Sequence, residues 1–189
     1  MPRAGLTRSL VLDAAADLAD QVGFEGVTPS AVARAVGIRT PSLYAHVDGA
    51  GALRDGITVR ALDEMADAAS RNVAGRSRGS ALRALADAYR DYARVHPGRY
   101  AATRRRLAPG HDGVEAGRRH TELLASVLRG YGLPEEDHVH AVRLIGSTVH
   151  GFIALEAAGS FDHSDPETDV SWDRVVDVLH GALDAWPAV

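Results

Sequence analysis

Two neighbouring Thr-Pro pairs, Thr28-Pro29 and Thr40-Pro41, constrain the fold of this chain more than any other feature. A hydroxyl residue followed by proline marks a helix start, because the hydroxyl accepts a bond from an unpaired backbone N–H and the proline ring already holds a helical φ angle. Gly37 lies between the pairs, where the residue after a helix end commonly adopts a left-handed conformation. The sequence therefore predicts two short helices separated by a tight turn.

The spacing of apolar residues indicates which faces of these helices are buried. Val32 with Val36, and Leu43 with Val47, are pairs four residues apart, so each pair lies on one side of its helix. The start and outer face of the second helix then carry small polar groups, a phenol and an imidazole. A short helix with such a surface suits the major groove of DNA. We predict a helix-turn-helix whose DNA-contacting residues are Ser30, Arg39, Thr40, Pro41, Ser42, Tyr44 and His46.

Three of these residues have an alternative role. Tyr44 and His46 are expected to contact DNA, although either could instead pack inside a small helical domain. Arg39 at the turn is expected to bind a phosphate or a guanine, and the alternative is a solvated turn arginine. Thr40 and Ser42 can bond to a phosphate or to several base edges, so they position the helix more than they specify a sequence.

The segment 43–47, LYAHV, resembles the recognition helix of the TetR family of transcriptional regulators, which reads Leu-Tyr-x-His followed by an aromatic or aliphatic residue. The stretch from Thr28 to Gly37 is similar to the preceding helix and turn of that family. Ala50 departs from the family pattern, which commonly has a phosphate-binding lysine there, and so does Ser30, where some members carry a base-reading arginine. Both departures lower the electrostatic share of DNA affinity.

The resemblance implies a function and a set of partners. It implies a homodimeric repressor that binds a palindromic operator in double-stranded DNA and is released by a small-molecule effector. It also implies that the last two long helices of each subunit pair in a four-helix dimer interface. A second hypothesis, from a different class, is a helical small-molecule-binding protein or enzyme whose N-terminal unit has lost DNA binding.

The whole chain is predicted to be all-α, because no segment alternates apolar and polar residues as a strand would. Residues 1–48 are predicted to form a three-helix DNA-binding domain, and a long helix at about 49–73 links it to an effector-binding and dimerisation domain at 75–189. The buried side of the first helix is predicted to comprise Val11, Ala14, Ala15, Leu18 and Val22. The other helices are expected at about 7–22, 80–96, 99–107, 114–129 and 134–158, with a last one ending at 186.

Aromatic residues on one helical stripe suggest where an effector binds. Tyr89 and Tyr92 share a stripe with leucines, and the resemblance implies that the surrounding helices enclose a mostly apolar cavity. The predicted effector-binding residues are Tyr89, Tyr92, Leu124, Leu128, Thr148 and Phe152, although residues of this kind also form ordinary cores.

The two C-terminal helices carry features that the resemblance connects with dimerisation. The stretch around His150-Gly151 is similar to a His-Gly-centred C-terminal region in one TetR subgroup. Gly146 and Gly151 weaken a helix interior, so they indicate close helix contact or room for a ligand. The apolar stripe of the last helix fits either dimer pairing or an internal core: Trp172, Val175, Val176, Leu179 and Leu183.

Composition excludes several classes of function. The chain has no cysteine, so disulfides and thiolate metal sites are excluded, and no apolar run approaches the ~20 residues of a membrane span. A cytoplasmic protein without cofactor, metal or catalytic site is therefore expected, since His138 and His140 point apart on a helix and no nucleophile or phosphate-loop pattern is present. Residues 1–60 hold six arginines and six acidic residues, which predicts a shallow salt dependence of DNA binding.

Overall fold

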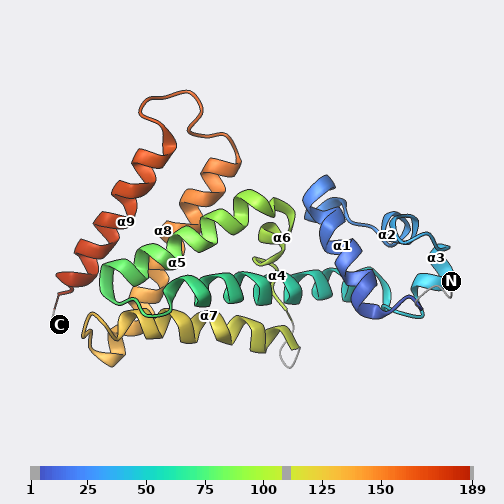
Figure 1. Cartoon of the computed structure of the whole chain (residues 1–189), viewed down its shortest axis with the longest axis horizontal. Coiled ribbons are helices and arrows are strands. Elements are labelled where there is room, and N and C mark those ends of the chain that lie inside the picture. The colour runs from blue at the N-terminus through green and yellow to red at the C-terminus, as the bar shows by residue number, and fades with distance from the viewer. Residues whose placement is uncertain (1–4, 108–111, 188–189) are drawn as a thin grey trace. The chain divides into compact units, whose positions relative to one another are not determined.

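The computed structural model describes residues 5–107 and 112–187. All the regular elements in these residues are helical, which confirms the predicted all-α fold (Figure 1). The α-helices are α1 (Arg8–Val22), α2 (Pro29–Ala35), α3 (Thr40–Leu43), α4 (Gly49–Val73), α5 (Arg78–Val95), α6 (Pro97–Ala102), α7 (Asp112–Leu128), α8 (His138–Ala157) and α9 (Thr168–Asp184). Short 3₁₀ turns occupy Phe24–Gly26 and Glu135–Asp137.

Most of the predicted helix bounds agree with these elements to within a few residues. Two bounds differ more clearly. α6 ends at Ala102 and not at 107, and α8 begins at His138 and not at 134 because a 3₁₀ turn precedes it. None of the helices in the described residues combines the length and the apolarity that crossing a lipid bilayer requires.

The chain packs as two compact units. The first unit contains the residues up to Glu64 and those from Val95 to Gly117, and the second contains Met65–Arg94 and the residues from Arg118 onward. The segment 95–117 therefore packs with the helix-turn-helix, whereas the sequence grouped it with the C-terminal domain. The functional division at residues 48 and 75 stays a prediction.

The core of the first unit is made of small and branched apolar side chains. Val22 was predicted to lie in it but is 53% exposed, because Phe24 in the following turn fills this end of the core. Ala14 and Leu18 are half-buried. The fully buried members are Val11, Ala15, Ala16, Ala19, Phe24, Val27, Val32, Ala33, Leu43, Val47, Leu53, Ile57 and Ala102.

A carboxylate of α1 holds the start of α6, which lies beside α1 (Figure 1). Oδ1 of Asp20 accepts the backbone N–H of Arg99 at 2.9 Å, and Oδ2 pairs with Nδ1 of His96 at 2.9 Å. His96 precedes α6 and supplies no capping bond of its own. Asp20 therefore caps α6 from a distant part of the chain.

Backbone approach and further polar contacts complete this docking. A Cβ placed on Gly98 would lie 1.9 Å from the backbone oxygen of Ala19, so the two helices touch through their main chains. At the other end of α6, the buried hydroxyl of Thr58 in α4 donates to the carbonyl of Ala102 at 3.2 Å. α6 is thus fixed to the first unit at both ends.

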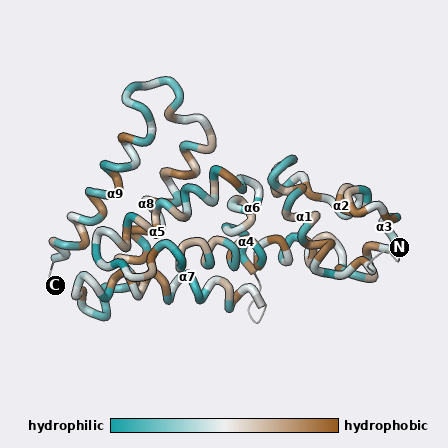
Figure 2. The backbone as a smooth tube through the Cα atoms, viewed as in Figure 1, coloured by the Kyte–Doolittle hydropathy of each residue, from teal (hydrophilic) through white to brown (hydrophobic). Residues whose placement is uncertain are grey.

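The second unit has larger side chains in its core. α5 buries Leu82, Leu85, Tyr89 and Tyr92, which confirms the predicted stripe. α9 buries Trp172, Val176, Leu179 and Leu183, each at most 3% exposed, within its own subunit. The connection between α8 and α9 is largely hydrophilic, whereas apolar and polar bands alternate along α9 itself (Figure 2).

Candidate functional site

The turn of the helix-turn-helix has the conformation that the sequence predicts. The hydroxyl of Thr28 accepts the N–H of Ala31 at 3.3 Å, which caps α2. Gly37 follows α2 with a φ of 72°, and the N–H of Ile38 bonds to the carbonyl of Ala33 at 2.9 Å. This pattern is the Schellman ending, in which a left-handed glycine lets the chain reverse at once.

The second helix starts one residue earlier than predicted. Arg39 is the N-cap and makes no side-chain capping bond, and Thr40 is already helical, so the prediction that the Thr40 hydroxyl caps α3 was wrong. The reason is that the carbonyl of Arg39 already accepts the N–H of Ser42 at 2.9 Å. Regular α3 spans four residues, and Leu43 (0% exposed) and Val47 (3%) anchor it to the core.

The predicted DNA-contacting side chains surround this anchored helix. Tyr44 is 50% exposed, as a residue that reads a groove must be. His46 was expected to point outward but is half-buried, and so is Thr40. The other members of the set are exposed: Ser30, Arg39, Pro41 and Ser42. The role of these seven residues in DNA contact stays a prediction.

The predicted effector-binding residues lie on α5, α7 and α8 in the second unit. Tyr89 is buried, and its hydroxyl lies 2.7 Å from Nδ1 of His120 on α7. The ring of Tyr89 also stacks on His150 of α8, with 5.8 Å between centroids and 18° between planes. Sequence reasoning did not include either histidine, because residues from three helices meet here. Tyr92, Leu124 and Leu128 are buried.

Thr148 and Phe152 lie elsewhere on α8. Thr148 lines an apolar groove of about 300 Å³ between α8 and α9, together with Leu144, Arg174, Val175, Val178, Leu179 and Ala182. Phe152 packs against the ring of Trp172, with 5.1 Å between centroids, and against Phe161 at 5.0 Å. The effector role of the six predicted residues stays a prediction.

A buried ion pair joins α5 to α8. Arg90 is only 4% exposed, and it donates through Nε and Nη2 to the two carboxylate oxygens of Glu156 at 2.9 and 2.5 Å. Arg94 donates to the same carboxylate at 2.9 Å. Burial acts to raise the pKa of Glu156, but the bonds from Arg90 and Arg94 outweigh it and hold that pKa below its usual value. The guanidinium of Arg90 also lies 4.9 Å from the ring centroid of Trp172.

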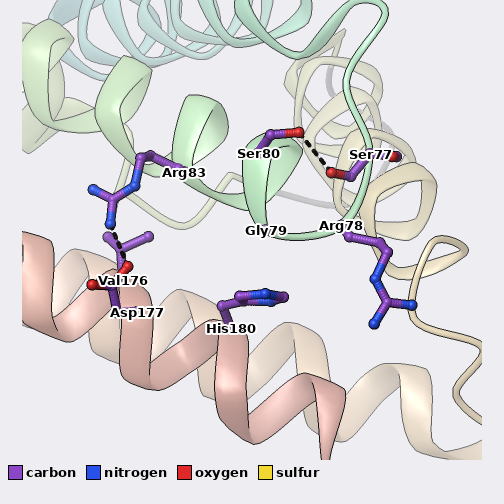
Figure 3. A pocket seen from close by; sticks show the side chains of 8 residues that line it. All are labelled: Ser77, Arg78, Gly79, Ser80, Arg83, Val176, Asp177 and His180. Atoms are coloured by element: carbon purple, nitrogen blue, oxygen red, sulfur yellow. Dashed lines mark hydrogen bonds and ion pairs between the residues drawn. The ribbon is translucent and has the colours of Figure 1, made fainter.

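A polar pocket of about 470 Å³ lies between the start of α5 and α9 (Figure 3). Its cations are already paired: Arg83 donates to Asp177 at 2.8 Å, and Arg78 pairs with Asp184. His180 faces Gly79 across the pocket (Figure 3). Because these charges are neutralised internally, the pocket has no excess charge to offer an ionic ligand.

Comparisons with known proteins find matches to the N-terminal and the C-terminal part of the chain. Residues 11–47 match the profile described as "Bacterial regulatory proteins, tetR family", and residues 82–179 match "Tetracyclin repressor-like, C-terminal domain". The HTH-type transcriptional regulator Rv0681 of Mycobacterium tuberculosis is 36% identical over 166 residues, which cover 87% of this chain and 76% of that protein. The HTH-type transcriptional regulator YobS of Bacillus subtilis is 35% identical over 174 residues, which cover 87% of this chain and 86% of that protein.

Solved structures share the fold at lower identity. A Rhodococcus sp. RHA1 protein superposes with a TM-score of 0.78 at 21% identity, over 97% of this chain and 98% of that one. TetR-Q116A from Acinetobacter baumannii AYE, solved in complex with minocycline, superposes with a TM-score of 0.75 at 18% identity, over 98% of this chain and 100% of that one. Together with the capped helix-turn-helix, these matches show that the chain belongs to the TetR family of DNA-binding transcriptional regulators.

Proposed function

We propose that this regulator is a homodimeric repressor that binds a palindromic operator and leaves it when a small molecule binds the second unit. The observation that carries the DNA-binding part is the short α3, which is anchored by Leu43 and Val47 and surrounded by exposed polar residues and Tyr44. A rigid helix with such a face can present side chains to base edges in the major groove.

The cluster of Tyr89, His120 and His150 supports an effector site. A buried phenol and two half-buried imidazoles supply directional hydrogen bonds among apolar side chains, which is the usual composition of small-molecule sites. A structural neighbour was solved with minocycline, which supports a small-molecule site in this fold. Effector binding would then favour a dimer shape with lower operator affinity.

The outer face of α8 and α9 supports the homodimer. Val176, Leu179 and Leu183 were expected to pair with the partner subunit, but they are buried in the core of their own subunit. We therefore place the proposed dimer interface at the apolar groove between α8 and α9. Val178 on that face is 70% exposed. Gly151 is exposed, and a Cβ built there meets no atom within 4 Å, so its absent side chain leaves room for a partner helix.

The test measures binding of the purified protein to fragments of its own promoter region by fluorescence anisotropy, with a scrambled fragment of equal length as control. Sedimentation of the same sample reports the oligomeric state. We expect a dimer that prefers the promoter fragment by at least about a hundredfold. A monomer, or equal affinity for both fragments, would contradict the proposal. Equal affinity would favour the alternative, a helical small-molecule-binding protein or enzyme whose N-terminal unit has lost DNA binding.

A further inference from the structure

The arginines of the first unit divide into two groups by their partners. The first group is neutralised by carboxylates of the same unit. Arg105 donates to Asp55 at 2.8 Å, and Arg99 lies 3.2 Å from Glu64. The ion pairs of this group include Arg54 with Glu25, Arg60 with Asp13 and Glu64, Arg99 with Asp17, Asp20 and Glu64, and Arg105 with Asp55.

The second group has no carboxylate partner among the described residues, and three of its members lie on the helix-turn-helix and at the start of α1, whereas Arg106 lies outside them. Arg8, Arg34 and Arg39 are exposed, and their side chains have no partner among the residues that the structure describes. Arg34 lies in the last turn of α2 and Arg39 is the N-cap of α3, so these two residues flank the turn.

These two groups of arginines show that the net charge of residues 1–60 does not describe the charge of the DNA-reading surface. Residues 1–60 have no net charge by composition, which indicated a weak attraction to nucleic acid. In the folded unit, Arg99 and Arg105 come from outside that range and neutralise acidic residues of α1 and α4. The ion pairs thus neutralise Asp13, Asp17, Asp20, Glu25 and Asp55, and Asp48 is the acidic residue of 1–60 left exposed. Arg8, Arg34 and Arg39 therefore leave an excess of positive charge at the part of the unit that reads DNA.

We propose that Arg34, together with Arg8 and Arg39, binds the phosphodiester backbone of DNA. This rests on the proposed function. Arg34 lies one helical turn after the exposed Ser30, on the outer side of α2. In a helix-turn-helix the first helix crosses the sugar-phosphate backbone and the second reads base edges, so an exposed arginine on α2 meets phosphates. Such contacts fix the register of α3 but carry no sequence information.

The salt dependence of binding tests this assignment. Three phosphate contacts per subunit correspond to six per dimer, which predicts a slope of about −5 in log K against log salt concentration. Arg34→Gln removes one contact per subunit, so the slope should fall in magnitude by about 2. Affinity at about 0.1 M salt should fall on the order of tenfold to a hundredfold, equally for operator and scrambled DNA.

Two control variants separate a local contact from a change in net charge. Arg106→Gln also removes an exposed charge that has no partner among the described residues, but from a position outside the helix-turn-helix. Its slope should equal that of the unmodified protein. Arg34→Lys keeps the charge and should keep the slope, and a circular-dichroism melt confirms that each variant is folded.

Three outcomes would overturn the inference. An unchanged slope in Arg34→Gln would remove Arg34 from the phosphate contacts, and an equal change in Arg106→Gln would show an effect of net charge alone. A loss confined to the operator would make Arg34 a base-reading residue. In each case the unmodified dimer would still prefer its operator, whereas failure of the unmodified protein to bind DNA would overturn the proposed function as well.

Discussion

Among the residues that the structure describes, the most exposed ion pair of the first unit and the most buried one of the second unit have contrasting surroundings. In the first unit, Arg54 and Glu25 (31% and 83% side-chain exposure) pair at the surface, around an alanine-rich and valine-rich core. In the second unit, Arg90 and Glu156 (5% and 17%) lie inside, among the rings of Phe152 and Trp172. The difference indicates that the exposed pair can be removed with little loss of stability, whereas removing one partner of the buried pair is costly.

The largest expected effect comes from breaking the buried pair. Glu156→Ala leaves the guanidinium of Arg90 buried without its main partner, and it should lower the free energy of unfolding by about 3–5 kcal/mol. The matched change in the first unit, Glu25→Ala, should cost less than about 1 kcal/mol because that carboxylate is exposed. Calorimetry of both variants measures the contrast, and equal losses would contradict it.

The second test concerns the contact between α6 and α1. Gly98→Ala places a methyl group 1.9 Å from the carbonyl oxygen of Ala19, so α6 must move away, at a cost of about 1–3 kcal/mol. Gly51→Ala is the control, because a Cβ there meets no atom within 4 Å and alanine should stabilise α4 by about 0.5–1 kcal/mol. Denaturant unfolding of the two variants should therefore shift in opposite directions. A shift in the same direction would mean that α6 is not packed so tightly.

The third test separates binding from stability within α3. Tyr44→Ala should weaken operator binding by about 1–3 kcal/mol and leave the melting temperature unchanged, since half of this side chain is exposed. His46→Ala should lower both quantities, because His46 is half-buried. Anisotropy titrations and thermal melts measure the two effects. Unchanged operator affinity in Tyr44→Ala would remove this residue from the DNA-contact set.

The smallest expected effect is the pH dependence that Glu156 gives to the stability of the second unit. The pKa of Glu156 is held below its unfolded value by Arg90 and Arg94, so its stabilising contribution is complete above about pH 4.3. The contribution is lost as the pH falls through the lower pKa of the folded state. The Glu156→Gln variant should lack this part of the acid destabilisation, which unfolding curves between about pH 5 and 3 can measure. Identical acid profiles would contradict the assignment.

Features that depend on residues close together in the sequence could be predicted, whereas features that depend on residues far apart in the sequence could not. Thr28 caps a residue three positions away and Gly37 ends the helix directly before it, so local chemistry was sufficient for the helix-turn-helix. The cap of α6 by Asp20 joins residues 79 positions apart, and Arg90 and Glu156 are 66 apart. Neither contact has a local signal.

The apolar pattern predicted which residues are buried, but it did not predict which residues they contact. The stripe of Val176, Leu179 and Leu183 was correctly identified as apolar, but periodicity could not decide between the subunit core and a second subunit. Similarly, Tyr89 was identified as a buried aromatic residue, whereas His120 and His150 gave no sign that they would meet it. Pairing between helices depends on tertiary packing, which a single sequence encodes only indirectly.

The cap that Asp20 provides for α6 has a consequence for protein engineering. A regulator with this architecture can be used to build chimaeras, in which the DNA-binding part of one protein is joined to the effector-binding part of another. A junction at residue 48 would keep Asp20 from one parent and take Arg99 and Gly98 from the other, so a foreign side chain at position 98 could strike the carbonyl of Ala19. A transplant that carries residues up to Glu64 together with Val95–Gly117 keeps both surfaces of this contact in one parent. The exchangeable module is therefore discontinuous in sequence.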